Sequence, residues 1–145
     1  MIIDSTLLFS DGQAITADAA STNIVDLGAT GTPYGHLGAL IRDVGKGQAI
    51  PLLITVTETF NNLTSMQILI QTDDNSSFSS ATTVAETPAI PQASLVAGYQ
   101  VPFPNVIAEG VKERYVRIYY DITGAAPTTG KVTATVVAAR QTNRR

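Results

Sequence analysis

Few residues in this 145-residue chain could carry out chemistry, and the first of them is its single histidine, His36. The chain has no cysteine, so disulfides and thiolate-held metals are excluded, and its single histidine excludes multi-histidine metal sites. His36 is the only imidazole that could act as a general base, and spacing alone does not exclude a Ser-His-Asp triad, since triads assemble from distant positions. However, the serines lie in turn-like runs, and no Gly-x-Ser-x-Gly motif occurs. We therefore interpret His36 as a surface or interface residue, and predict a protein that is not an enzyme and that binds no cofactor or metal.

Two further segments resemble ligand-binding loops only in part. Residues 28–47 contain six glycines, but Gly45-Lys46 is followed by Gly47 where a phosphate-binding loop needs Ser or Thr. This segment is interpreted as a structural loop. Residues 73–75, Asp-Asp-Asn, gather oxygen atoms that would suit calcium, although the alternating acids and bidentate glutamate of an EF-hand are missing. Asp and Asn also start turns by bonding their own backbone, which is the favoured interpretation, with an ion site as the alternative.

A candidate interface lies near the C-terminus. Tyr115, Arg117 and Tyr119 alternate along one expected strand, so they share a face, and Tyr and Arg are enriched at protein interfaces. Arg140 begins a basic tail, residues 140–145, on an acidic protein. The tail is either a frayed terminus or an electrostatic tether to an acidic partner. We predict Tyr115, Arg117, Tyr119 and Arg140 as interface residues.

The elements that must position these side chains are strands. Apolar and polar residues alternate with period 2, and β-branched and aromatic residues fill the alternating positions. The clearest strands are predicted at residues 50–59, 66–71, 116–122 and 132–138, and weaker ones at 7–10, 13–16, 23–27, 39–42, 82–87 and 100–103. A short helical turn is expected around residues 77–81. Residues 88–110, with four of the seven prolines, are expected to form a wandering connection with edge-strand pieces.

Together these patterns predict an all-β fold. No stretch of a dozen residues shows a 3.6-residue period, so the crossover helices of a parallel sheet are not expected. About eight short strands indicate a single antiparallel β-sandwich of jelly-roll type over residues 1–145, with residues 139–145 as a flexible basic tail.

The composition limits the partners. Charged residues make up 14% of the chain, hydrophobic ones 44%, and the net charge is −3. A nucleic-acid partner is not expected, because such proteins usually carry a basic stripe, and no apolar run is long enough to span a membrane. The low charge has two explanations: strands use Ser and Thr where helices use Glu and Lys, or part of the surface is buried against another subunit.

The sequence resembles a known family at several places. These are the opening Met1 to Thr16, Ala20-Ser-Thr-Asn-Ile-Val-Asp-Leu-Gly28, Ile68-Leu-Ile-Gln-Thr-Asp-Asp-Asn-Ser-Ser-Phe78, and the strand at residues 114–121. They resemble the small jelly-roll cement, or decoration, proteins of tailed bacteriophages.

The resemblance implies a structural role, not a chemistry. Such proteins sit on the outer surface of the icosahedral phage head and bridge neighbouring major capsid subunits, often as dimers or trimers. It implies a virion protein made in the bacterial host cytoplasm, with the major capsid protein as partner and with self-association, a dimer being favoured and a trimer possible. The alternative is a jelly-roll binding module, for carbohydrate or a receptor, within a phage structural component.

Overall fold

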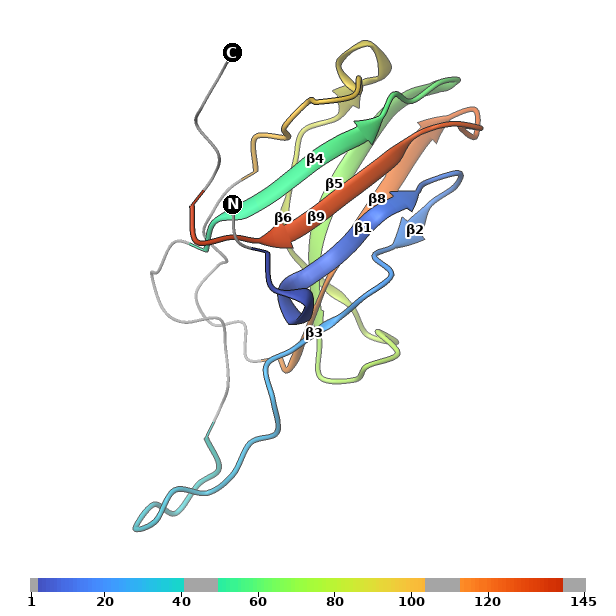
Figure 1. Cartoon of the computed structure of the whole chain (residues 1–145). Coiled ribbons are helices and arrows are strands. Elements are labelled where there is room, and N and C mark those ends of the chain that lie inside the picture. Colours follow the sequence, from blue (N-terminus) through green and yellow to red (C-terminus); the bar gives the residue numbers. More distant parts are fainter. Residues whose placement is uncertain (1–2, 41–49, 104–112, 140–145) are drawn as a thin grey trace.

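Two antiparallel sheets packed face to face make up the computed structural model, which describes residues 3–40, 50–103 and 113–139 (Figure 1). The elements in chain order are η1 (Ser5–Leu7), β1 (Leu8–Ala14), β2 (Ala19–Ala20), β3 (Val25–Asp26), β4 (Leu52–Glu58), β5 (Leu63–Asp73), β6 (Thr82–Glu86), β7 (Ile90–Pro91), η2 (Gln92–Ser94), β8 (Tyr115–Gly124) and β9 (Lys131–Val136). Neither of the two described helices is long and apolar enough to cross a membrane.

The strand order is that of a jelly roll. One sheet has the order β1-β9-β4, and the other has the order β2-β8-β5-β6, with β3 also pairing β8 and β7 also pairing β5. Residues 98–101 run beside β4, because Gly98 N–H donates to the Val56 carbonyl over 2.8 Å and Val101 N–H to the Ile54 carbonyl over 2.9 Å. Each sheet thus has four strand positions, and the chain passes repeatedly from one sheet to the other. The prediction of an all-β sandwich is confirmed.

The core follows directly from the period-2 alternation. The inward side chains of β5 and β8, such as Ile68 and Ile118, are fully buried against those of β4 and β9, such as Val56 and Val132. Each such side chain contributes roughly 1.5–3 kcal/mol when it leaves water. The four segments with the clearest alternation form β4, β5, β8 and β9, which are the longest strands apart from β1.

One polar chain crosses this apolar interior. The Ser10 hydroxyl donates to Gln13 Oε1 over 2.7 Å, so its single proton is used and the Tyr120 hydroxyl, 2.8 Å away, donates to Ser10 Oγ. Gln13 Nε2 in turn donates to the Ala20 carbonyl over 2.8 Å. Burial raises the pKa of Tyr120, which keeps the phenol neutral and able to donate. The chain of bonds ties β1 to β8 and β2 across the sandwich.

The weaker strand predictions needed correction. Residues 7–10 and 13–16 were expected as two strands, but Leu8–Ala14 form the single strand β1. Its register shifts between Leu8 and Ser10 and again between Ser10 and Gln13, where Gly12 has φ 53°. This is bulge geometry, which lets one strand continue past a glycine. Residues 77–81 form turns and not a helical turn, because Phe78 adopts a positive φ of 53°.

Two other predicted strands are reduced or absent. Residues 100–103 form no continuous strand: Gln100 makes an isolated bridge with Thr55, and Val101 N–H donates to the Ile54 carbonyl. Ala39 and Leu40 are not in a strand, and residues 41–42 lie outside the described residues. Within residues 88–103, the expected edge piece is β7, where Pro91 pairs with β5 at the margin of its sheet.

Candidate interaction surfaces

The outer face of β8 carries the predicted Tyr-Arg-Tyr pattern. Tyr115, Arg117 and Tyr119, here called the β8 row, are all half-buried, and the residues between them point into the core. In the antiparallel register with β5, Arg117 lies opposite Gln71 and Tyr119 lies opposite Leu69. The structure therefore brings three of the four predicted interface residues together on one face. The fourth, Arg140, and the basic tail after it lie outside the described residues.

Arg117 is held in place on three sides. Its Nε donates to Gln71 Oε1 over 2.8 Å, its Cζ lies 4.2 Å from the centre of the Phe78 ring, and the Tyr119 ring centre is 5.6 Å away on the same face. Burial lowers the pKa of the guanidinium, which remains a cation at neutral pH. A side chain that is already ordered loses little conformational freedom when a partner binds, so the β8 row is preorganised for recognition.

The acidic turn after β5, residues 74–81, places Phe78 against the sheet. The buried Asp73 carboxylate accepts hydrogen bonds from Asn75 N–H over 2.9 Å and from Ser80 N–H over 2.8 Å, and the Ser80 hydroxyl contacts both of its oxygens. The bond from Asn75 N–H contributes most to lowering the pKa of Asp73. The alternative of an ion site gains no support from this geometry, since the carboxylate serves the turn itself. No group of three or more His, Asp or Glu residues that could hold a metal occurs among the described residues.

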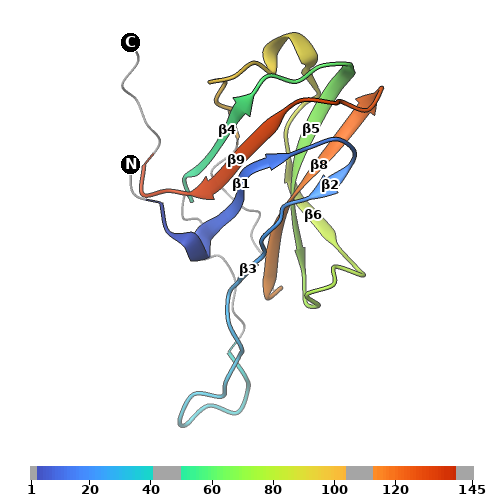
Figure 2. The same ribbon diagram turned by 45° about the vertical axis from the view of Figure 1, so that its right-hand side comes forward.

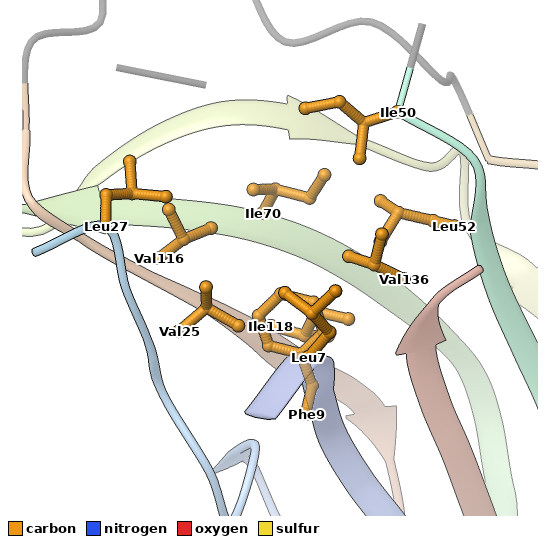
Figure 3. A pocket seen from close by; sticks show the side chains of 10 residues that line it. All are labelled: Leu7, Phe9, Val25, Leu27, Ile50, Leu52, Ile70, Val116, Ile118 and Val136. Carbon is orange, nitrogen blue, oxygen red and sulfur yellow. The ribbon is translucent and has the colours of Figure 1, made fainter. Parts of the chain in front are cut away.

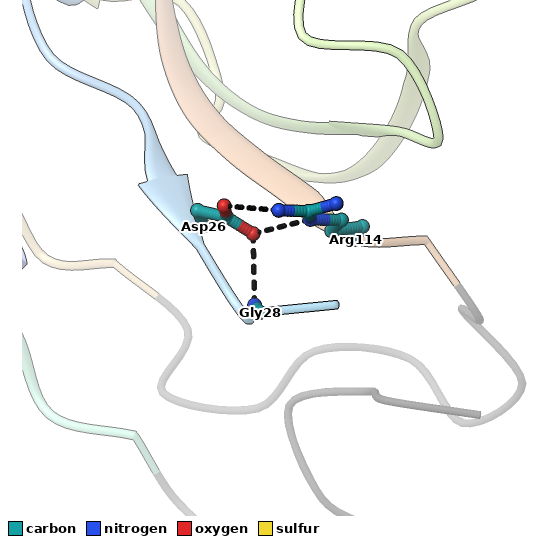
Figure 4. A network of polar contacts seen from close by, with 3 residues as sticks. All are labelled: Asp26, Gly28 and Arg114. Atoms are coloured by element: carbon teal, nitrogen blue, oxygen red, sulfur yellow. Dashed lines mark hydrogen bonds and ion pairs between the residues drawn. The ribbon is translucent and has the colours of Figure 1, made fainter. Parts of the chain in front are cut away.

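An ion pair at the residue before β8 was not predicted. Arg114 makes a two-pronged contact with Asp26, with Nε 2.6 Å from Oδ1 and Nη2 2.7 Å from Oδ2, and its Cζ lies 5.0 Å from the Tyr115 ring centre. Asp26 Oδ1 also accepts Gly28 N–H over 2.8 Å (Figure 4). Residues 26 and 114 are 88 positions apart, so only the pairing of β3 with β8 shows that they meet. The network fixes the direction in which the chain leaves β3.

From this point residues 28–40, here called the arm, project beyond the end of the sandwich, as both views show (Figures 1 and 2). The arm contains no Asp, Glu, Lys or Arg. It is closed on itself, since Leu40 N–H donates to the Gly31 carbonyl over 2.9 Å and His36 N–H donates to the Pro33 carbonyl over 3.1 Å. Tyr34 and Leu37 are fully exposed, at 108% and 107%. The described part of the glycine-rich segment is thus a structured, uncharged projection.

His36 lies on this arm. Gly38 N–H donates to its Nδ1 over 3.1 Å, and the residue is exposed. The contact is local to the arm, which agrees with the interpretation of His36 as a surface residue.

A cavity of about 220 Å³ lies between the two sheets at the end of the sandwich from which the arm leaves (Figure 3). The described side chains that line it are all apolar, among them Phe9 from β1, Val25 and Leu27 from the stretch before the arm, Ile50, and Val116 from β8. Period-2 patterning identified most of these residues as strand residues. The pattern did not predict the cavity between these side chains, because an unfilled volume depends on how the two sheets pack against each other.

Comparison with models of known protein families gave a match. Residues 9–136, which run from within β1 to the end of β9, match the model of the family described as Bbp16. At a coarse level the match points to a phage-related protein. No curated protein matches the chain.

Proposed function

The chain belongs to the Bbp16 family, and from this premise we propose that it is a structural virion protein that cements a phage head. In this proposal it binds the outside of the icosahedral shell and bridges major capsid subunits. It acts after synthesis in the bacterial cytoplasm, as a self-associated form in which a dimer is favoured and a trimer possible. It needs no catalytic residue, cofactor or metal.

The observation that carries the proposal is the presence of two separate candidate surfaces. A bridging protein that acts as a self-associated form must hold both a capsid subunit and a second copy of itself, so it needs more than one adhesive patch. The β8 row is a rigid patch on the outer face of one sheet, and the arm reaches past the end of the sandwich (Figure 1). Both surfaces expose tyrosine, a residue type that is enriched where binding energy concentrates.

The distribution of charge supports the same proposal. Charged residues form 14% of the chain, well below the roughly 25% of ordinary soluble domains. The arm has none at all, and charge depletion is the compositional mark of the buried centre of an interface. The resemblance of residues 1–16 and 68–78 to cement proteins of tailed phages adds the identity of the partner, the major capsid protein.

Co-sedimentation with purified phage heads tests the proposal. Heads stripped of accessory proteins are mixed with the full chain, and the bound fraction is measured over a range of concentrations. We expect saturable binding in a fixed ratio to the capsid protein. Arg117→Ala and Tyr119→Ala are each expected to weaken binding roughly tenfold or more, the loss typical of central aromatic and arginine side chains.

Lys131→Ala is the matched control. Lys131 is a cation on β9 of the opposite sheet, in an exposed ion pair with Glu58 at 2.7 Å, so its removal changes the net charge equally. We expect its effect on head binding to be within twofold. Absence of the chain from virions, or equal losses for Lys131→Ala and Arg117→Ala, would contradict the proposal.

The half-exposed rings of Tyr115 and Tyr119 favour one alternative, a carbohydrate- or receptor-binding module of a phage structural component. That function predicts binding on a glycan array that is lost in Tyr115→Ala and Tyr119→Ala, with no saturable binding to stripped heads. A flat array together with head binding excludes it.

A further inference from the structure

We propose that the arm and the apolar cavity are the two halves of one interface between two copies of this chain, with the tip of each arm filling the cavity of the other copy. The inference deepens the self-association in the proposed function and rests on it only for its biological setting. It assigns a role to the two features of the described structure that the β8 row leaves unexplained.

The arm has an apolar tip that no described part of its own chain covers. Tyr34 and Leu37 are fully exposed. The other large apolar side chains on the described surface are only about half exposed, namely those of Ile3, Leu40 and Val96. Adjacent apolar groups that stand free on an uncharged segment are typical of an interaction site. The internal hydrogen bonds of the arm and the bond from Gly28 N–H to Asp26 hold the segment in shape before any partner arrives. Preorganisation of this kind reduces the entropy lost on binding.

The cavity has the complementary character. Its volume of about 220 Å³ exceeds the roughly 150 Å³ of an apolar cavity that is known to take up benzene, and every described side chain in its lining is apolar. It therefore has room for a leucine side chain or an aromatic ring, and it offers nothing to a charged or strongly polar group. A tip without charge and a cavity without polar lining suit each other.

The position of the arm indicates a reciprocal exchange between two copies. Val25 and Leu27 line the cavity and the arm begins at Gly28, so the root of the arm lies at the rim of the cavity while its tip points away (Figures 2 and 3). Tyr34 is six residues beyond Gly28, a reach of at most about 20 Å. If two arms lie antiparallel about a two-fold axis, each root stays at its own cavity and each tip arrives at the cavity of the other copy. Such an interface is self-complementary and closed, as most homodimer interfaces are.

The first test is the mass of the full chain in solution, by light scattering or sedimentation, together with a double variant. We expect a dimer for the unmodified protein and a shift to monomer for Tyr34→Ser/Leu37→Ser, with the dissociation constant raised at least tenfold. Val96→Ser is the control, because Val96 is an exposed apolar residue outside the arm and cavity, and it should leave the dimer intact. Circular dichroism should show the same fold for all three proteins.

The second test uses the absence of cysteine, which makes any introduced thiol unique. Leu37→Cys chains are mixed with Ile50→Cys chains and oxidised mildly, Ile50 being part of the cavity lining. We expect a disulfide-linked heterodimer. Val96→Cys mixed with Ile50→Cys should give far less.

Three results would overturn the inference: a monomeric unmodified protein at high micromolar concentration, a dimer that persists in the double serine variant, or a yield of the Leu37→Cys and Ile50→Cys heterodimer no higher than that of the Val96→Cys control. The head-binding experiment separates the two proposals. If the protein is a monomer that binds heads, the arm exchange is contradicted and the proposed function is supported. If it is an arm-exchanged dimer that binds no heads, the arm exchange is supported and the proposed function is contradicted.

Discussion

Two loops of the sandwich, the acidic turn at residues 74–81 and the arm at residues 28–40, differ in whether their aromatic side chain is buried. The turn folds back so that Phe78 is only 7% exposed and lies against Arg117, whereas the arm leaves Tyr34 fully exposed. Both segments contain a residue with positive φ, Phe78 in one and Gly35 in the other. Backbone geometry at these positions therefore does not decide which loop is buried.

The difference lies in their polar anchors. Asp73 is buried at the foot of the turn and accepts bonds from both Asn75 and Ser80, which pulls the loop onto the sheet. The anchor of the arm is Asp26, which accepts a hydrogen bond from Gly28 N–H at the root and also binds Arg114. Beyond the root, the described hydrogen bonds of the arm are internal. An acceptor at the base of the turn that reaches as far as Ser80 thus holds that segment against the sheet, whereas Asp26 contacts the arm at its root and the arm stays exposed.

The largest effect is expected from removing the buried ring. Phe78→Ala should lower the free energy of unfolding by about 3 kcal/mol, because it deletes a ring from a packed site beside Arg117. Urea denaturation measures the loss. Tyr34→Ala is the matched control, an aromatic-to-alanine change on the arm, and equal losses in the two variants would remove the distinction between the segments.

A smaller effect should follow from weakening the anchor of the turn. The folded-state pKa of Asp73 is lowered, so the stability that its carboxylate contributes is present above the unfolded pKa of about 3.9 and is lost as the pH falls through the folded value. Asp73→Asn should lower the melting temperature by several degrees at pH 7. It should also flatten the decline in stability below about pH 4. Thermal melts of both proteins between pH 7 and pH 2.5 give the comparison, and parallel curves would show that the carboxylate does not anchor the loop.

The smallest effect on folding is expected at the tip of the arm. Tyr34→Ser should change the unfolding free energy of the separated chain by no more than about 0.5 kcal/mol, because the ring makes no buried contact within its own copy. Denaturation at a concentration low enough to dissociate any dimer is the required measurement. A loss comparable to that of Phe78→Ala would place the arm against the body of the same molecule.

Much of the fold was predictable because period-2 alternation is a local property. The segments around Val56, Ile68, Ile118 and Val132 each carry the pattern within a few residues, and each became a central strand. Two predictions for segments with weaker patterns were wrong because a single residue changed the local backbone conformation. Gly12 turned two expected strands into one bulged strand, and Phe78 adopted a conformation that apolar patterning does not reveal.

The candidate site shows the same division. Alternation along one strand was enough to place Tyr115, Arg117 and Tyr119 on one face, which the structure confirms. Nothing local indicated that Phe78 would stack on Arg117 or that Asp26 would pair with Arg114, because these contacts join residues 39 and 88 positions apart. The interface role of the β8 row stays a prediction until binding is measured.

The sequence by itself determined the class of fold, the faces of the strong strands and the shortage of charge, since each of these depends on residue type and nearest-neighbour spacing. Only the tertiary structure decided that the glycine-rich segment stands away from the sandwich and that a cavity remains at the root of the arm. Exposure and empty volume are properties of how distant segments meet. A leucine or a tyrosine in a loop has the same sequence neighbours whether it is buried in its own core or is held out for the core of another molecule.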